Sequence, residues 1–158
     1  MTVVNDLALV VLAAGLAVAI PGIMSAIGVA MAGMAAAAAT AEDPKKFSKL
    51  FILEVLPGTQ GIYGFIAGFM ILIFTGVLGT GLKAGVVGFA ILAAALPAIL
   101  QGFTAIFQGK VATASVAAVA KKPEVFTAGM MYTVMVELYA ILGLLATILM
   151  LTSKAIIP

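Results

Sequence analysis

Glu137 is the residue of this sequence whose type and position most clearly predict chemistry. It is the single ionisable carboxylate within the apolar run over 130–150. That run is long enough to cross a bilayer, because about 20 residues at ~1.5 Å each span the ~30 Å hydrocarbon core. A carboxylate at mid-membrane costs on the order of 2.5–3.5 kcal/mol. Glu137 therefore needs a neutralising partner, which is a proton, a cation or a charged side chain.

Two further polar side chains are expected at the depth of Glu137. Gln60, Gln108 and Glu137 all lie well inside apolar stretches, at similar distances from the polar loops that bound them. At ~1.5 Å per residue, all three sit roughly 18–24 Å from the level of those loops. Three different helices are thus predicted to place polar groups in one layer of the membrane.

The stretch around Pro57 adds oxygen atoms to this layer. A spacing of i, i+3, i+4, i+7 puts four side chains on one helix face, namely Leu56, Thr59, Gln60 and Tyr63. Pro57 has no N–H and weakens the helix at this point. Carbonyls freed in a membrane helix persist where another group satisfies them.

The donor set of the layer favours Na⁺ over a proton. It offers a hydroxyl, two amides, a phenol, main-chain carbonyls and one carboxylate, which together are hard oxygen ligands with one negative charge. A proton on Glu137 needs fewer ligands than this. Structural alternatives remain open, since Thr59 can bond back to a helix carbonyl and Gln60 can bond Gln108 across helices.

The composition excludes most soluble functions. The chain has 158 residues, of which 65% are hydrophobic and 9% charged, whereas soluble domains carry about 25% charged residues. The formal charge of +2 is too small to indicate a nucleic-acid partner. With no Cys and no His, thiol chemistry and the commonest general base and metal ligand are lacking.

Four apolar stretches, near 7–41, 44–76, 84–120 and 124–152, predict an all-α membrane protein with four transmembrane helices. The N-terminus lacks the basic residues of a secretory signal, so the first stretch is expected to be retained. Five lysines occupy the loops 41–49 and 121–124. The positive-inside rule therefore places these loops in the cytoplasm and both termini outside.

An offset of 79 residues relates the two halves of the chain. The loop sequence DPKKF over 43–47 falls on KPEVF over 122–126, and GIYG over 61–64 falls on AILG over 140–143. We interpret this as a duplication, with a first transmembrane hairpin over 1–80 and a second over 81–158 within one membrane domain. Gly58 then occupies the position of Glu137, so only the second hairpin carries the carboxylate.

The first and third helices are rich in small residues at spacings that let helix backbones approach closely in lipid. They indicate either a tight monomeric bundle or the inner wall of a ring of copies. Two more charges, Glu54 and Lys110, lie at matching depth nearer the loops. They are interpreted either as an ion pair or as a lysine that extends along its own helix to the headgroups.

Three segments resemble one family of membrane proteins. They are LPGTQGIYG over 56–64, FQGK over 107–110 and VELYAILG over 136–143. Together they resemble the membrane rotor proteolipid (subunit K or c) of V-type (A/V-type) ATPases, in particular the bacterial sodium-translocating form. The resemblance covers nearly the whole chain, including the doubled hairpin.

This resemblance implies a Na⁺ site with five oxygen ligands. These are the Leu56 carbonyl, the Thr59 hydroxyl, the side chains of Gln60 and Gln108, and the Glu137 carboxylate. It also implies that Tyr63 hydrogen-bonds Glu137 and holds it in place. Glu54 departs from the family pattern, in which an uncharged residue is expected.

The resemblance further implies that the chain forms a ring of identical copies in the lipid membrane. The ring would rotate against a stator subunit that carries an Arg, and the loops 41–49 and 121–124 would grip a central stalk. ATP is hydrolysed in a separate cytoplasmic head, so the chain is expected not to be catalytic alone. The alternatives are proton coupling in the same family, a small secondary ion transporter, or a purely structural pore-former.

Overall fold

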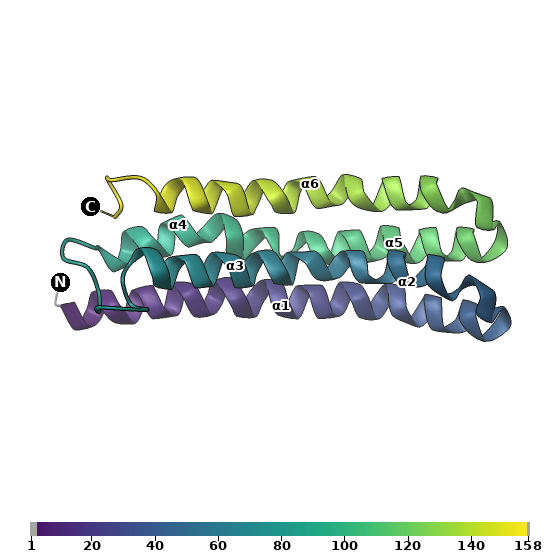
Figure 1. Ribbon diagram of the computed structural model, residues 1–158, viewed down its shortest axis with the longest axis horizontal. Coiled ribbons are helices and arrows are strands. Elements are labelled where there is room, and N and C mark those ends of the chain that lie inside the picture. The colour runs from purple at the N-terminus through teal and green to yellow at the C-terminus, as the bar shows by residue number, and fades with distance from the viewer. Residues whose placement is uncertain (1–2, 158) are drawn as a thin grey trace.

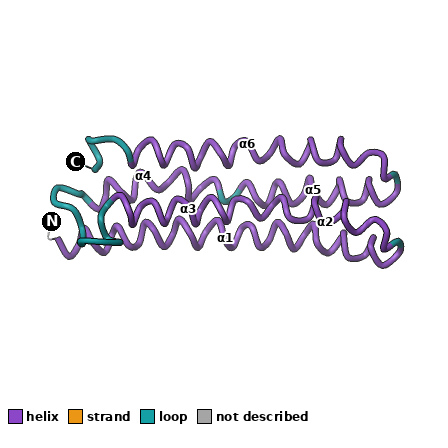
Figure 2. The backbone as a smooth tube through the Cα atoms, in the orientation of Figure 1, coloured by secondary structure: helices purple, strands orange, loops and turns teal. Residues whose placement is uncertain are grey.

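The chain folds into an elongated bundle of helices, and the computed structural model describes residues 3–157 (Figures 1 and 2). Four helical spans are long and apolar enough to cross a membrane, which are Val3–Glu42, Pro44–Phe74, Gly88–Lys121 and Pro123–Leu151. The α-helices are α1 Val3–Glu42, α2 Phe47–Val55, α3 Thr59–Phe74, α4 Gly88–Gln101, α5 Thr104–Lys121 and α6 Phe126–Leu151. The predicted class, an all-α protein with four transmembrane helices, is confirmed.

Two of the four spans are broken near their middle. A 3₁₀ turn over Leu56–Gly58 separates α2 from α3, at the proline where the sequence predicts a weakened helix. The third span breaks between α4 and α5 at Gly102 and Phe103, which the sequence did not predict. There the Thr104 hydroxyl donates to the Gln101 carbonyl at 2.7 Å. Both breaks lie near the depth of the predicted polar layer.

The two lysine-rich loops lie together at one end of the bundle, and the termini lie at the other (Figure 1). Lys46 Nζ donates to the Ala120 carbonyl at 2.7 Å, and Lys49 Nζ donates to the Pro123 carbonyl at 3.1 Å. These contacts tie the loop of one hairpin to that of the other. The assignment of this end to the cytoplasm stays a prediction.

The local structure repeats between the two hairpins. The 3₁₀ turns over Pro44–Lys46 and Pro123–Val125 are followed by helices that begin at Phe47 and Phe126. Each pair keeps the offset of 79 residues seen in the sequence. The division at residue 80 lies in the connection between α3 and α4, and that exact boundary stays a prediction.

Small residues allow α1 to pack closely along α3, α4 and α5. A Cβ on Gly109 of α5 would lie 2.6 Å from the Gly28 Cα of α1, so the two backbones are in contact. At the end with the termini, the Asp6 carboxylate of α1 accepts a 2.8 Å bond from the Gly88 N–H and caps α4. The α6 helix packs mainly on α4 and α5.

Candidate cation-binding site

Three side chains from two neighbouring helices hold the Glu137 carboxylate of α6. Its Oε2 accepts from the Thr59 hydroxyl and from Gln108 Nε2, both at 2.7 Å, and its Oε1 accepts from the Tyr63 hydroxyl at 2.5 Å. Glu137 is only 7% exposed. The carboxylate is thus fixed between α3, α5 and α6, with a different set of donors on each oxygen.

The break at Pro57 shapes one wall of this site. In the 3₁₀ turn over Leu56–Gly58, the Leu56 carbonyl accepts the backbone N–H of Thr59. The same carbonyl accepts the Thr59 hydroxyl at 2.8 Å. The turn therefore brings a main-chain oxygen and a hydroxyl oxygen next to the carboxylate, as the proline in the sequence predicts.

The two predicted glutamines meet at the site. Gln60 Nε2 donates to Gln108 Oε1 at 2.5 Å, and both side chains are fully buried. Gln108 Nε2 also donates to the Thr133 carbonyl at 3.2 Å. The structure thus brings together every residue of the predicted set, and their role in ion binding stays a prediction.

Three oxygens lie around the single proton of the Thr59 hydroxyl, and one of them, Gln60 Oε1, has no other donor among the described residues. Thr59 Oγ1 lies 2.7 Å from Glu137 Oε2, 2.8 Å from the Leu56 carbonyl and 3.4 Å from Gln60 Oε1. A hydroxyl has one proton and can donate it to one of these oxygens at a time. A cation among the four oxygens would satisfy them together.

The charge and composition of this set fit a monovalent cation. Within residues 3–157, no three His, Cys, Asp or Glu side chains come together as a metal-binding group. Glu137 is the only charged member of the set, and the other oxygens are neutral. Hard, mostly neutral oxygens with one negative charge suit an alkali cation better than a transition metal.

Sequence reasoning missed Gln101, which supports the site from α4. It is 5% exposed, and its Nε2 donates to the Gln60 main-chain carbonyl at 3.2 Å. Its Oε1 has no hydrogen-bond partner among the described residues. The available signal was its spacing, because Gln101 precedes Gln108 by seven residues, which is about two turns along one helix face.

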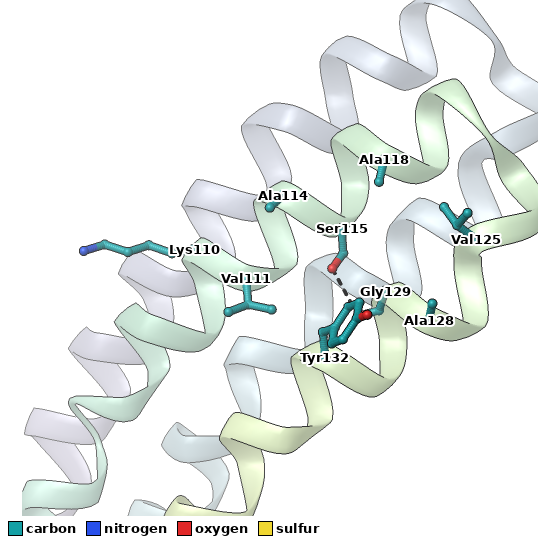
Figure 3. Close-up of a pocket in the computed structure, with 9 residues that line it drawn as sticks. All are labelled: Lys110, Val111, Ala114, Ser115, Ala118, Val125, Ala128, Gly129 and Tyr132. Atoms are coloured by element: carbon teal, nitrogen blue, oxygen red, sulfur yellow. Dashed lines mark hydrogen bonds between the residues drawn. The ribbon is translucent and has the colours of Figure 1, made fainter.

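Of the two interpretations of Glu54 and Lys110, the ion pair within one chain is contradicted by the structure. Among the described residues, the ion pair within 4.0 Å is Lys46–Asp43 at 3.4 Å, near the loops. Glu54 lines a groove between α1 and α2. Lys110 lines a groove between α5 and α6, and Figure 3 shows its side chain extending away from the other lining residues. The two charges lie at a similar depth along the bundle, but they lie on different edges of it.

Comparison with known proteins gives a consistent picture. The family model that describes the C subunit of ATP synthase matches this chain twice, at residues 12–71 and 87–150. The chain is 48% identical over 141 residues to the V-type sodium ATPase subunit K of Enterococcus hirae, covering 89% of this chain and 88% of that protein. It is 42% identical over 148 residues to the A-type ATP synthase subunit K of Methanocaldococcus jannaschii, covering 94% of this chain and 64% of that protein.

Proposed function

Because this chain belongs to the ATP synthase C-subunit family, we propose that it is a rotor-ring subunit that carries Na⁺ through reversible binding at Glu137. It is a membrane subunit of a rotary ATPase complex. The relative that is 48% identical is named a sodium ATPase subunit, which supports Na⁺ as the ion carried here. ATP hydrolysis then belongs to other subunits of the complex, and this chain is not catalytic alone.

The observation that carries the sodium proposal is the convergence of oxygen atoms at Thr59. Three oxygens, from Leu56, Gln60 and Glu137, lie within 3.4 Å of the Thr59 hydroxyl oxygen, so four oxygens meet at this point. A proton bound to Glu137 would add one donor to this group and leave Gln60 Oε1 with only the 3.4 Å contact. A sodium ion attracts all four oxygens at once, so it explains the arrangement better.

The Gln108 amide would complete the ligand set by turning. In the structure it points Nε2 at Glu137 and Oε1 at Gln60. The oxygen and nitrogen of an amide occupy nearly the same volume, so a half-turn would present the oxygen to the ion without moving a helix. The turn would give up the bonds of the Gln108 amide to Gln60 Nε2 and to the Thr133 carbonyl. The Gln108 amide can then either donate a hydrogen bond to Glu137 or coordinate the ion, but it cannot do both at once.

The two carboxylate oxygens of Glu137 have separate roles in this mechanism. Tyr63 holds Oε1, while Oε2 faces Thr59 and Gln108, where the ion is proposed to bind. With Na⁺ bound, the site is neutral and can face lipid at low cost. At the stator, an Arg would compete for the carboxylate and release the ion.

The remaining parts of the chain fit this role. The end of the bundle that holds the loops 41–49 and 121–124 is proposed to face the cytoplasm and grip the central stalk. The termini would then lie outside. The joined loops give the stalk one continuous surface per chain, since Lys46 and Lys49 bridge the two hairpins.

Carbodiimide labelling of Glu137 in the purified oligomer tests the proposal. The reagent attacks the protonated acid, so bound Na⁺ should slow labelling while the same concentration of K⁺ should not. Labelling that depends on pH but not on Na⁺ would overturn sodium coupling and favour a proton-coupled rotor. A native mass of one or two chains, in place of a closed oligomer, would favour a secondary transporter.

A further inference from the structure

We propose that Glu54 and Lys110 form an ion pair between neighbouring copies of this chain and thereby set the register of the ring interface. The proposal rests on the proposed function, because it requires a ring. It concerns two charges that the cation site does not use. It also accounts for the absence of their pairing within one chain.

The two charges lie on opposite edges of the bundle. Glu54 lines a groove of about 420 Å³ between α1 and α2, in the first hairpin. Lys110 lines a groove of about 620 Å³ between α5 and α6, in the second hairpin. In a closed ring of identical chains, every contact joins one edge of a chain to the other edge of the next. Such a contact brings these two grooves together.

The charges also match in depth. Gly28 of α1 gives a common level, because Gly109 and Pro57 both lie against it. Glu54 lies three residues from Pro57 and Lys110 lies one residue from Gly109, both toward the loops. At 1.5 Å per residue, their Cα atoms differ by only ~3 Å along the bundle, which a lysine side chain can span.

Each charge needs a partner in the membrane. Lys110 is exposed on the surface of the bundle, and its Nζ lies 5.6 Å from the centroid of the Phe107 ring. The Glu54 carboxylate lies against Gly33, close to where a Cβ on that glycine would stand. An unpaired charge on a membrane-facing surface is costly. Pairing the two across a shared interface neutralises both.

The α1 helix offers a surface on which a neighbour can approach closely. Gly15 and Gly22 are exposed, and a Cβ on either would meet nothing within 4 Å in the same chain. These glycines are therefore not required by packing within one copy. They belong to an exposed or half-buried stripe of small residues on α1, which is Gly15, Ala19, Gly22, Ala26, Ala30, Gly33 and Ala37. Stripes of this kind permit close contact between membrane helices.

Cysteine cross-linking tests the pairing directly, since the chain has no native cysteine. We expect Glu54→Cys combined with Lys110→Cys to give a ladder of linked chains with a short bis-methanethiosulfonate reagent. Such a linker suits a Glu–Lys distance better than a disulfide, which needs Cα atoms within ~7 Å. The matched control pairs Lys110→Cys with Ile52→Cys, an exposed position two residues from Glu54 that does not line the groove. The control should stay monomeric.

Native mass separates the possible failures. The double variant Glu54→Cys, Lys110→Cys could form a closed oligomer and yet give no cross-link between chains, only one within a chain or none at all. That result would overturn the pairing and leave the rotor assignment intact. Single chains in the native mass would overturn both proposals. A ladder of equal yield from the control pair would also refute the specific contact.

Charge variants give a second measurement that does not depend on cysteine chemistry. Glu54→Gln and Lys110→Met should each lower the temperature at which the oligomer dissociates in detergent. The exchange Glu54→Lys with Lys110→Glu should restore it, because coupled residues are not additive. Loss of stability from Lys110→Met with no effect of Glu54→Gln would show that Lys110 pairs with an anionic lipid instead, and would overturn the proposal.

Discussion

Replacing Thr59 with valine should weaken Na⁺ binding about 10- to 150-fold. Valine keeps the shape of threonine and removes the one hydroxyl that contacts Leu56, Gln60 and Glu137. A hydrogen bond to a charged group contributes about 1.5–3 kcal/mol. At about 1.4 kcal/mol per factor of ten, losing this oxygen as a ligand gives the stated range.

The assay is the Na⁺ concentration that halves the rate of carbodiimide labelling at Glu137, supported by equilibrium binding of radioactive Na⁺. Thr75→Val is the matched control, because Thr75 is a buried threonine that, like Thr59, donates its hydroxyl to a main-chain carbonyl, here that of Ile71 at 2.7 Å. This control should keep the wild-type Na⁺ affinity. An affinity of Thr59→Val within twofold of wild type, in an intact oligomer, would refute the assignment of Thr59 as a ligand.

Five further substitutions test other parts of the structure. Glu137→Gln should abolish Na⁺ binding and carbodiimide labelling while native mass still shows the closed oligomer; residual labelling elsewhere in the chain would contradict this. Tyr63→Phe removes a bond to the carboxylate, and binding assays should show an affinity loss smaller than that of the ligand variants, since Oε2 keeps its own partners. Gly109→Val should lower the free energy of unfolding, measured by thermal denaturation, by about 1–3 kcal/mol, because the added side chain overpacks against α1. Gly58→Ala should be tolerated in the same measurement, because the nearest atom to the added Cβ is 3.5 Å away. Asp6→Ala removes the cap of α4 and should cost about 0.5–2 kcal/mol, visible as faster proteolysis of the connection before α4.

The sequence predicts the four spans well because length and apolarity alone decide them in a membrane. The break at Pro57 is equally predictable, since a proline lacks the N–H that the helix needs. The break at Gly102 and Phe103 has no such local cause. The proline of that span, Pro97, lies inside α4 without interrupting it, so the position of this break depends on packing that a single sequence does not display.

Depth along the helices was enough to predict which residues meet at the cation site. It was not enough to predict whether Glu54 and Lys110 meet. Gln60, Gln108 and Glu137 share both a depth and a direction toward the centre of the bundle, and the structure brings them together. Glu54 and Lys110 share the depth alone. Which neighbour a side chain faces depends on how the spans are arranged around each other. That arrangement is a property of the tertiary structure.

The glycine at position 58 has a consequence for the rotor proposed above. It stands where the first hairpin repeats the position of Glu137, and a Cβ added there would lie 3.5 Å from a methyl group of Val29. One carboxylate therefore serves four membrane helices. A ring of such chains moves half as many ions per revolution as a ring of equal circumference with an acid in every hairpin. The work of each revolution is then divided among fewer ions, so each ion can be driven against a steeper electrochemical gradient. In the proposed rotor, the glycine in the first hairpin thus sets how many ions each revolution carries.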